Sequence, residues 1–280
     1  MLIKLLEIGH CTHPHRIIDR RGNWRPKKFP AHVAVMQHPT EGFMLFDTGY
    51  AERFSEVTAK YPEKLYQLIT PMYLKDSEFL INQLLSLGIM GHQIRYIFIS
   101  HFHADHIAGL KDFPDSKFIC SRIGLQNALK LGRYRSLFKG FLPKLLPDDF
   151  SKRTIFLEDC KRIKLKSFMH PFCIGYDVFN DGLFSAISLP GHASGHYGLL
   201  SKYQKNSIFL IGDAAFTMDD IEKLSKPSKI PNLLFDNVKA YYETLDQLAY
   251  LYSSNHDVKI IPTHCYRAST LLTGEKVKRQ

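Results

Sequence analysis

Short apolar runs separated by polar turns recur along most of the chain and predict β-strands. The predicted strands are 2–9, 32–36, 42–46, 94–99, 117–120, 176–179, 183–189, 207–211 and 258–261, with 2–9 expected at a sheet edge. Apolar positions at helical spacing predict a helix that Asp76 caps and Gly88 ends, one from about Arg122, and one over 238–252. The polar stretch 10–24 predicts a surface loop, and 51–75 predicts helical segments interrupted by Pro62 and Pro71. Strands and helices therefore mix throughout the chain.

One histidine-rich loop directly follows the predicted strand 94–99. Within it, His101, His103, Asp105 and His106 place three imidazoles and one carboxylate in six positions. Imidazole suits zinc and related metals, and a carboxylate adds one oxygen ligand. Because one four-coordinate ion cannot easily use all four groups of so short a loop, the pattern predicts two ions about 3.5–4 Å apart. The alternative is a histidine-rich surface loop without metal.

Four other residues with ligand-type side chains also lie at or just beyond the ends of predicted strands. They are Asp47, His192, Asp213 and His264. In layered α/β folds, strand ends bring side chains from distant parts of the sequence together. Asp47 starts Asp47-Thr48-Gly49 and is expected to orient ligand histidines, although a simple Asx-turn would also explain it. The recurrence of such residues predicts one shared site.

Length and composition fit an ordinary globular protein. The chain has 280 residues, 45% of them apolar and 23% charged, which favours one domain over 1–280 and excludes wholesale disorder. No apolar run approaches the length of a membrane span, and Lys4 and Glu7 interrupt the start where a signal peptide would need an unbroken apolar centre. The five dispersed cysteines predict reduced thiols and a cytoplasmic location.

Positive charge is concentrated in one part of the chain. Of the net charge of +10, residues 130–166 contribute +7, from eleven Lys/Arg against four acids. This basic window has weak periodicity and predicts a cap or insertion at about 130–175. It is either a solvated face or a basic rim that attracts an anionic substrate, nucleic acid or an acidic membrane surface.

The strand-end residues together resemble the signature of the metallo-β-lactamase superfamily. The matching elements are Ser100-His101-x-His103-x-Asp105-His106, Pro190-Gly191-His192-x-x-Gly195-His196, Gly212-Asp213, His264 and the upstream Asp47-Thr48-Gly49. The resemblance extends from about Leu2 to His264. With Asn180-Asp181-Gly182 before the His192 element, it is most similar to the quorum-quenching lactonases that open N-acyl homoserine lactones. The fold it implies is an αβ/βα sandwich of two mixed β-sheets flanked by helices.

The resemblance also implies roles for individual residues. His101, His103 and His192 would hold one metal ion, Asp105, His106 and His264 a second, and Asp213 would bridge the two. His196 would be a turn residue or a neighbour of the ligands. The implied cofactors are two divalent ions, with zinc as the default. A hydroxide shared by the ions would attack the substrate, and Asp105 would be the catalytic proton shuttle.

Two positions depart from the lactonase pattern. Lactonases of this group commonly carry a tyrosine three residues after the bridging Asp, and here that position is Phe216, which cannot donate a hydrogen bond. The donor would then come from another pocket residue such as Tyr50, Tyr197 or Tyr266. Many relatives follow the last His with Asp, and here Cys265 follows.

The expected function is metal-dependent hydrolysis of a lactone or another small ester, with a small molecule as the partner. A phosphodiesterase or nuclease and a thioesterase of the same fold are alternatives, and the basic window supports the former. Nucleic acid is not favoured, because no Gly/Pro-rich arm for gripping tRNA is present in the sequence. A non-catalytic metal-binding sensor is a further alternative, and a dimer is one option for the assembly.

Overall fold

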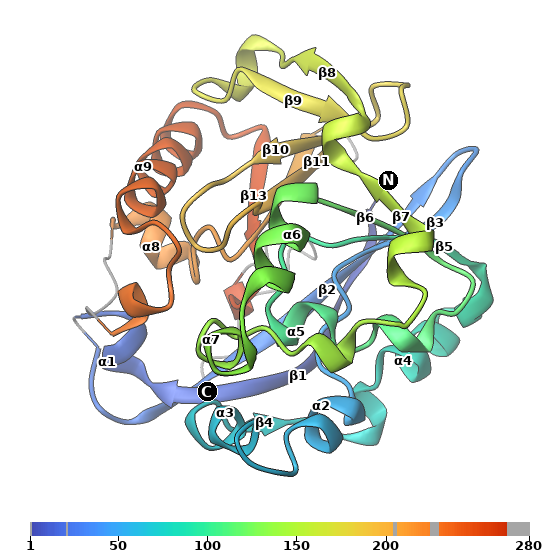
Figure 1. Ribbon diagram of the computed structural model, residues 1–280. Coiled ribbons are helices and arrows are strands. Elements are labelled where there is room, and N and C mark those ends of the chain that lie inside the picture. Colours follow the sequence, from blue (N-terminus) through green and yellow to red (C-terminus); the bar gives the residue numbers. More distant parts are fainter. Residues whose placement is uncertain (1, 21, 204–205, 225–229, 268–280) are drawn as a thin grey trace.

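The first of two mixed sheets forms the larger half of the molecule (Figure 1). The computed structural model describes residues 2–20, 22–203, 206–224 and 230–267. In spatial order the first sheet contains β4 (Met72–Tyr73), β1 (Leu2–Pro14), β2 (Pro26–His38), β3 (Gly42–Phe46), β5 (Ile94–Phe98), β6 (Lys117–Cys120) and β7 (Thr154–Phe156). β3, β5, β6 and β7 run parallel, and the other neighbours are antiparallel.

The second sheet lies against the first. In spatial order it contains β13 (Val258–Pro262), β12 (Asn206–Gly212), β11 (Tyr197–Tyr203), β10 (Phe184–Ser188), β9 (Ile174–Asp177) and β8 (Lys161–Lys164). Only β12 and β13 pair in parallel. The predicted Asn180-Asp181-Gly182 hairpin connects the antiparallel β9 and β10 and is confirmed. Both sheets are mixed, as expected from the resemblance.

Helices cover the outer faces of the two sheets (Figure 1). They are α1 (His15–Ile18), α2 (Glu52–Val57), α3 (Lys64–Ile69), α4 (Leu80–Ser86), α5 (Ala104–Ile107), α6 (Arg122–Lys130), α7 (Arg133–Phe138), α8 (Met218–Glu222) and α9 (Val238–Ser254). Short 3₁₀ turns occupy Asp76–Glu78, Gly91–Gln93, Leu110–Asp112, Pro143–Leu145, Phe150–Arg153, Leu157–Asp159, Ser167–Met169 and Pro231–Leu233. Within the described ranges, none of the helices is both long and apolar enough to cross a bilayer.

Side chains of the central strands alternate between two apolar cores. On β3, Met44 and Phe46 face the core between the sheets, whereas Leu45 faces the core under the helices. On β5, Phe98 stacks on Phe46 with the ring centroids 5.4 Å apart, and Ile97 points the other way. Because helices cover the outer face, both faces of these strands are buried, so they are apolar at nearly every position.

The N-terminal region differs from the sequence prediction. β1 does not end at Gly9 but continues to Pro14, and it pairs with β2 as far as Pro26. The loop predicted over 10–24 is therefore strand for its first five residues, 10–14. The edge position is also only partly correct, because β4 pairs with β1 at His10 and Cys11. The strand extends beyond most of the sheet, so the apolar alternation that identifies a strand fades there.

Two further elements correct the prediction. Asp76 starts a 3₁₀ turn, and the α-helix begins only at Leu80, because Phe79 has extended backbone angles. The basic window is not wholly a cap or insertion. Its later part supplies β7 to the first sheet and β8 to the second, whereas α7 and the residues up to Phe150 remain outside the sheets.

Candidate metal centre

The histidine loop and three other strand-end residues meet at one edge between the sheets. β5 ends just before the loop, and β12 and β13 end just before Asp213 and His264. The parallel pairing of β12 with β13 brings the ends of these two strands side by side. Gly212 has a positive φ of 55°, and a Cβ there would lie 2.7 Å from the His196 ring. The turn that presents Asp213 therefore requires glycine.

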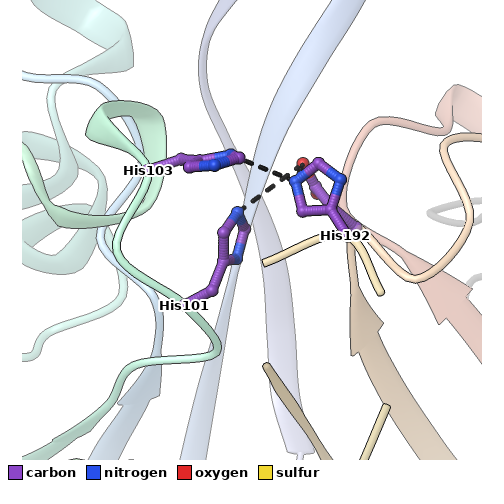
Figure 2. A group of neighbouring side chains, drawn as sticks. His101, His103 and His192 are labelled. Carbon is purple, nitrogen blue, oxygen red and sulfur yellow. Dashed lines mark hydrogen bonds and ion pairs between the residues drawn. The ribbon is translucent and has the colours of Figure 1, made fainter. Parts of the chain in front are cut away.

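A first group of ligand-type atoms comes from His101, His103, His192 and Asp213. Figure 2 shows the three imidazole rings pointing toward one another. His192 Nε2 lies 3.0 Å from His103 Nδ1 and 3.3 Å from Asp213 Oδ2, and His101 Nε2 lies 3.9 Å from the same oxygen. Zinc bonds of about 2.0–2.1 Å in a tetrahedron separate the ligand atoms by about 3.3 Å. The spacing fits one such ion.

A second group comes from Asp105, His106 and His264. His264 Nε2 lies 3.3 Å from Asp105 Oδ2, and His106 Nε2 lies 3.8 Å from the same oxygen. The other carboxylate oxygen of Asp213, Oδ1, lies 3.4 Å from His106 Nε2 and 3.2 Å from His264 Nε2. Asp213 Oδ2 lies 3.2 Å from His264 Nε2 as well, so the Asp213 carboxylate is within reach of both groups, as a bridging ligand must be.

Asp47 and Ser100 fix the rings from outside the centre. Asp47 Oδ2 lies 2.7 Å from His106 Nδ1 and accepts a hydrogen bond from the Ser100 hydroxyl at 2.8 Å, and Asp47 Oδ1 accepts one from the Ser100 backbone N–H at 2.8 Å. The Ser100 hydroxyl also lies 3.0 Å from His101 Nδ1. Asp47 adopts a φ of 61°, a conformation that Asp tolerates better than most residues. This carboxylate thus leaves His106 Nε2 free to face the centre.

The rings of His264 and His196 contact backbone groups. His264 Nδ1 lies 2.7 Å from the carbonyl of Pro30 on β2, so the ring is oriented without a following Asp. Cys265 instead accepts from the Met218 N–H at 3.4 Å. His196 is buried outside both groups, and its Nε2 accepts from the Asp213 N–H at 3.2 Å. His196 therefore supports the Asp213 backbone.

Burial and nearby charge shift the pKa values of the ligand histidines in two directions. Burial lowers the pKa of His101 and His192 well below the ordinary value, and the neighbouring histidines lower it further. Burial also disfavours the charged forms of His106 and His264, but the Asp213 carboxylate outweighs this and raises the pKa of both well above normal. For Asp105, burial raises the pKa, but the neighbouring His106 and His264 outweigh burial and lower the pKa to about 2.

The donor set fits divalent metal. The buried His101 Nε2, His106 Nε2 and Asp213 Oδ1 have no hydrogen-bond partner among the described residues. Leaving such atoms unpaired costs about 1–3 kcal/mol each, so a ligand is expected to satisfy them. All these atoms face the centre, and imidazole nitrogens with carboxylate oxygens suit zinc-type ions.

Aromatic rings line the His192 side of the centre. Phe216 meets His192 edge-on with the ring centroids 5.7 Å apart, and Phe235 lies 5.5 Å from the same ring. Phe235 stacks on the buried Tyr241 at 4.1 Å. Phe216 thus borders the site, where it offers a ring face and no hydroxyl.

The three tyrosines expected to replace the missing donor lie elsewhere or are inaccessible. Tyr197 packs against Tyr176 in the core between the sheets, so this prediction is wrong. Tyr266 donates to Glu7 at 3.1 Å. The hydroxyl of Tyr50 is buried without a hydrogen-bond partner among the described residues.

Two residues near the centre were missed by the sequence analysis. Tyr66 on α3 lies beside His103, and no ligand-type pattern in the sequence marks it. Lys139 of the basic window donates to the carbonyls of Leu234 and Phe235 at 3.0 and 2.9 Å and pairs with Asp236 at 3.1 Å. All three ammonium protons of Lys139 are therefore used to fasten α7 to the segment beside His192.

A groove begins at His103 and runs outward between α6, α7 and the loop that follows His192. Its inner part has a volume of about 350 Å³ and includes Phe102, Ala128 and Phe141. Leu131 and Lys139 also line an outer part of about 460 Å³, with Tyr134 and Phe138. An apolar substituent of a ligand held at the centre could lie along this groove.

Comparison with known proteins agrees with this geometry. Residues 27–252 match the metallo-β-lactamase superfamily. The chain belongs to the metallo-β-lactamase superfamily and is a hydrolase of that fold. Among its relatives in this superfamily is the N-acyl homoserine lactonase AttM of Rhizobium radiobacter, 26% identical over 256 residues, which cover 89% of this chain and 87% of the relative. AttM of Rhizobium johnstonii is 27% identical over 219 residues, which cover 76% and 75%. The predicted resemblance is confirmed.

Solved structures confirm the fold. An N-acyl homoserine lactone hydrolase with the product N-hexanoyl-L-homoserine at its catalytic metal centre aligns with a TM-score of 0.69 and 18% identity, covering 100% of this chain and 99% of the other. The dizinc quorum-quenching lactonase AidC aligns with a TM-score of 0.64 and 16% identity, covering 95% and 90%. The predicted sandwich of two mixed sheets flanked by helices is therefore correct.

Proposed function

We propose that this protein is a binuclear metal-dependent lactonase that opens N-acyl homoserine lactones or closely related lactones. The observation that carries the proposal is the placement of Asp213, whose two carboxylate oxygens lie 3.2–3.4 Å from ligand nitrogens of two separate groups. The lactonase relatives support the substrate class, since they cover most of the chain.

In this proposal His101, His103 and His192 hold one ion, Asp105, His106 and His264 hold the other, and Asp213 is shared. When bound, two such ions supply Lewis acidity and an acidified water near neutral pH. Zinc is the proposed metal, because borderline N/O ligand sets suit it. Asp47, Ser100 and the Pro30 carbonyl orient the rings of His106, His101 and His264.

Asp105 is proposed to take a proton from the attacking water and pass it to the leaving alkoxide. Its side chain is 12% exposed, compared with 4% for Asp213, so it is the carboxylate of the centre that a substrate can approach. A positioned carboxylate within hydrogen-bond reach of the leaving oxygen can deliver a proton as the ring opens. The groove beyond His103 would take the apolar acyl substituent.

Metal analysis followed by a substrate panel tests this function. Purified protein is expected to contain close to two equivalents of zinc-type metal per chain, and chelation should abolish hydrolysis. The panel comprises N-acyl homoserine lactones, a thioester and bis(p-nitrophenyl) phosphate, with lactones expected to give the highest kcat/KM. Purified protein that contains no metal and whose activity does not respond to chelators would contradict the proposal.

Phosphodiester hydrolysis is the second candidate, and the basic window was its main support. In the structure several cations of that window are already paired. Arg133 binds Glu63 through two hydrogen bonds, Arg153 binds Asp149, and Lys139 binds Asp236. A cation held by a carboxylate attracts phosphate less, so lactone opening stays the preferred proposal. The cytoplasmic location and the dimer stay predictions.

A further inference from the structure

Helix α3 carries Tyr66, whose hydroxyl lies across Gly140 from the His103 ring. The α3 helix is tied to α7 where Arg133 donates to Glu63, the residue before α3, at 2.8 and 2.9 Å. The Tyr66 ring packs edge-on against Phe54 with the centroids 5.7 Å apart, and part of the side chain stays exposed. The Tyr66 ring is thus positioned by packing against Phe54, and part of its side chain remains accessible.

Gly140 shows how close the Tyr66 hydroxyl comes to the centre. A Cβ at Gly140 would lie 3.5 Å from the Tyr66 hydroxyl oxygen and 3.3 Å from Cδ2 of His103. The two side chains therefore border the same gap, which a larger residue would fill. The backbone of Gly140 is fixed beside the histidine loop, because its carbonyl accepts from the Ala104 N–H at 2.8 Å.

The hydroxyl is a donor without an internal acceptor. Among the described residues, no side chain or backbone group makes a hydrogen bond with it. Burial raises the pKa of Tyr66 well above its usual value, and the carboxylates of Asp105 and Asp213 raise it further. The proton therefore stays on the hydroxyl, and the oxygen lies close enough to both carboxylates to feel their charge.

We propose that the Tyr66 hydroxyl donates a hydrogen bond to the carbonyl oxygen of the bound lactone as negative charge develops on that oxygen. This inference rests on the proposed function. A preorganised donor at a developing oxyanion typically contributes about 10²–10³ in kcat. Tyr66 would thus supply from α3 the hydroxyl that Phe216 cannot supply.

Tyr50 is the rival donor in this neighbourhood. Its hydroxyl is also unpaired, but the side chain is only 2% exposed and the hydroxyl oxygen is fully buried. A substrate could reach it only if the packing against Phe54, at 5.4 Å, opened. Tyr66 needs no such rearrangement.

The test compares Tyr66→Phe, Tyr50→Phe and Tyr61→Phe in zinc-loaded protein with N-hexanoyl homoserine lactone. Tyr61 precedes α3 and is 64% exposed, so its variant is the matched control. Tyr66→Phe is expected to lower kcat by about 10²–10³ with little change in KM, because the bond forms mainly in the transition state. Tyr61→Phe should keep wild-type kinetics, and zinc content should be equal in all variants.

A binding measurement adds a readout independent of turnover. Calorimetry with the ring-opened product N-hexanoyl-L-homoserine should show about tenfold weaker binding to Tyr66→Phe, because a hydrogen bond to a carboxylate is lost. Phe216→Tyr alone should not raise kcat, since the donor is already present. A tenfold gain with Phe216→Tyr, or a kcat loss in Tyr50→Phe in place of Tyr66→Phe, would overturn the role of Tyr66.

The outcomes separate this inference from the proposed function. If the wild type opens lactones and Tyr66→Phe does so equally well, Tyr66 is not the donor and the lactonase proposal stands. If the wild type opens no lactone, the lactonase proposal fails, and the variants are compared on whichever panel substrate it hydrolyses. A similar loss of kcat there supports a donor role for Tyr66, and an unchanged kcat overturns it.

Discussion

The metal centre and the rim around it differ in how far hydrogen bonds within the protein orient their side chains. The outer nitrogens of His106 and His264 are held by Asp47 and by the Pro30 carbonyl, so these rings have one orientation. The rim, which consists of Tyr66, Phe216 and Phe235, is aromatic, and its one hydroxyl has no acceptor within the described part of the chain.

We expect this difference to separate the residues that carry out the reaction from those that select the substrate. A ligand cage must be rigid to hold ions at bonding distance, so its supporting hydrogen bonds are made inside the protein. A rim must leave donors and ring faces unpaired, because the bound substrate forms hydrogen bonds with these donors and packs against these rings. Changes at the centre should therefore affect every substrate, and changes at the rim should distinguish among substrates.

The largest effect is expected at the shared carboxylate. Asp213→Ala removes an oxygen from both ligand groups, so metal content should fall toward zero and activity by at least about a thousandfold, since the ions contribute several kcal/mol of stabilisation. His196→Ala, which only supports the Asp213 backbone, should retain more of both. Elemental analysis and lactone kinetics measure the contrast. Equal losses in the two variants would contradict the bridging assignment.

A smaller effect is expected at Asp47, which contacts a ligand histidine rather than the metal. Asp47→Asn keeps the shape of the side chain but places an amide N–H₂ or a neutral oxygen against His106 Nδ1, so the ring loses its charged partner. The affinity for one of the two ions should fall by about 10–100-fold, as measured by competition with a chelator. Asp181→Asn is the control, because it weakens another carboxylate–histidine pair, with His38 at 2.6 Å. An unchanged metal affinity in Asp47→Asn would show that the Asp47 carboxylate is not needed to orient the His106 ring.

Behind the rim, a buried carboxyl predicts a pH effect on stability. Burial raises the pKa of Asp220 from 3.8 to about 7, and only one of its oxygens accepts hydrogen bonds, from the Phe216 and Thr217 N–H groups. The folded protein thus binds this proton more tightly than the unfolded chain. Its contribution to stability is full below pH 3.8 and is lost as pH rises through about 7.

Asp220→Asn should remove that pH dependence. At pH 8 the variant is expected to be more stable than wild type by about 1–3 kcal/mol, with a smaller difference at pH 5 that vanishes only below pH 3.8. Denaturant unfolding at the two pH values measures it. Asp219→Asn on the same helix is the control, because Asp219 is partly exposed. A wild type whose unfolding free energy rises between pH 5 and 8 more than that of Asp220→Asn would refute the assignment.

The smallest effect is expected at the outer rim. Arg133→Gln breaks an exposed ion pair with Glu63, so the free energy of unfolding should change little. Combined with Arg135→Gln, it should leave KM for a neutral lactone and its salt dependence nearly unchanged. A large rise in KM at low salt would show that the basic window recruits an anionic substrate after all.

The sequence by itself determined the parts of this protein that local pattern encodes. The apolar run before His101, the spacing of the histidine loop, and the aspartate or histidine after β12 and β13 are contiguous signals, because each depends on a strand and the residues next to it. Burial on both faces makes such strands apolar at every position, so they stand out.

Only the tertiary structure decided which separate elements touch at the site. The Pro30 carbonyl reaches His264 because the β1–β2 ribbon extends past the sheet, where apolar alternation fades. The Tyr66 hydroxyl lies across Gly140 from His103, and Lys139 donates to carbonyls far away in sequence. A backbone carbonyl, a tyrosine or a lysine has no distinctive spacing, and its role depends on the neighbours that packing gives it.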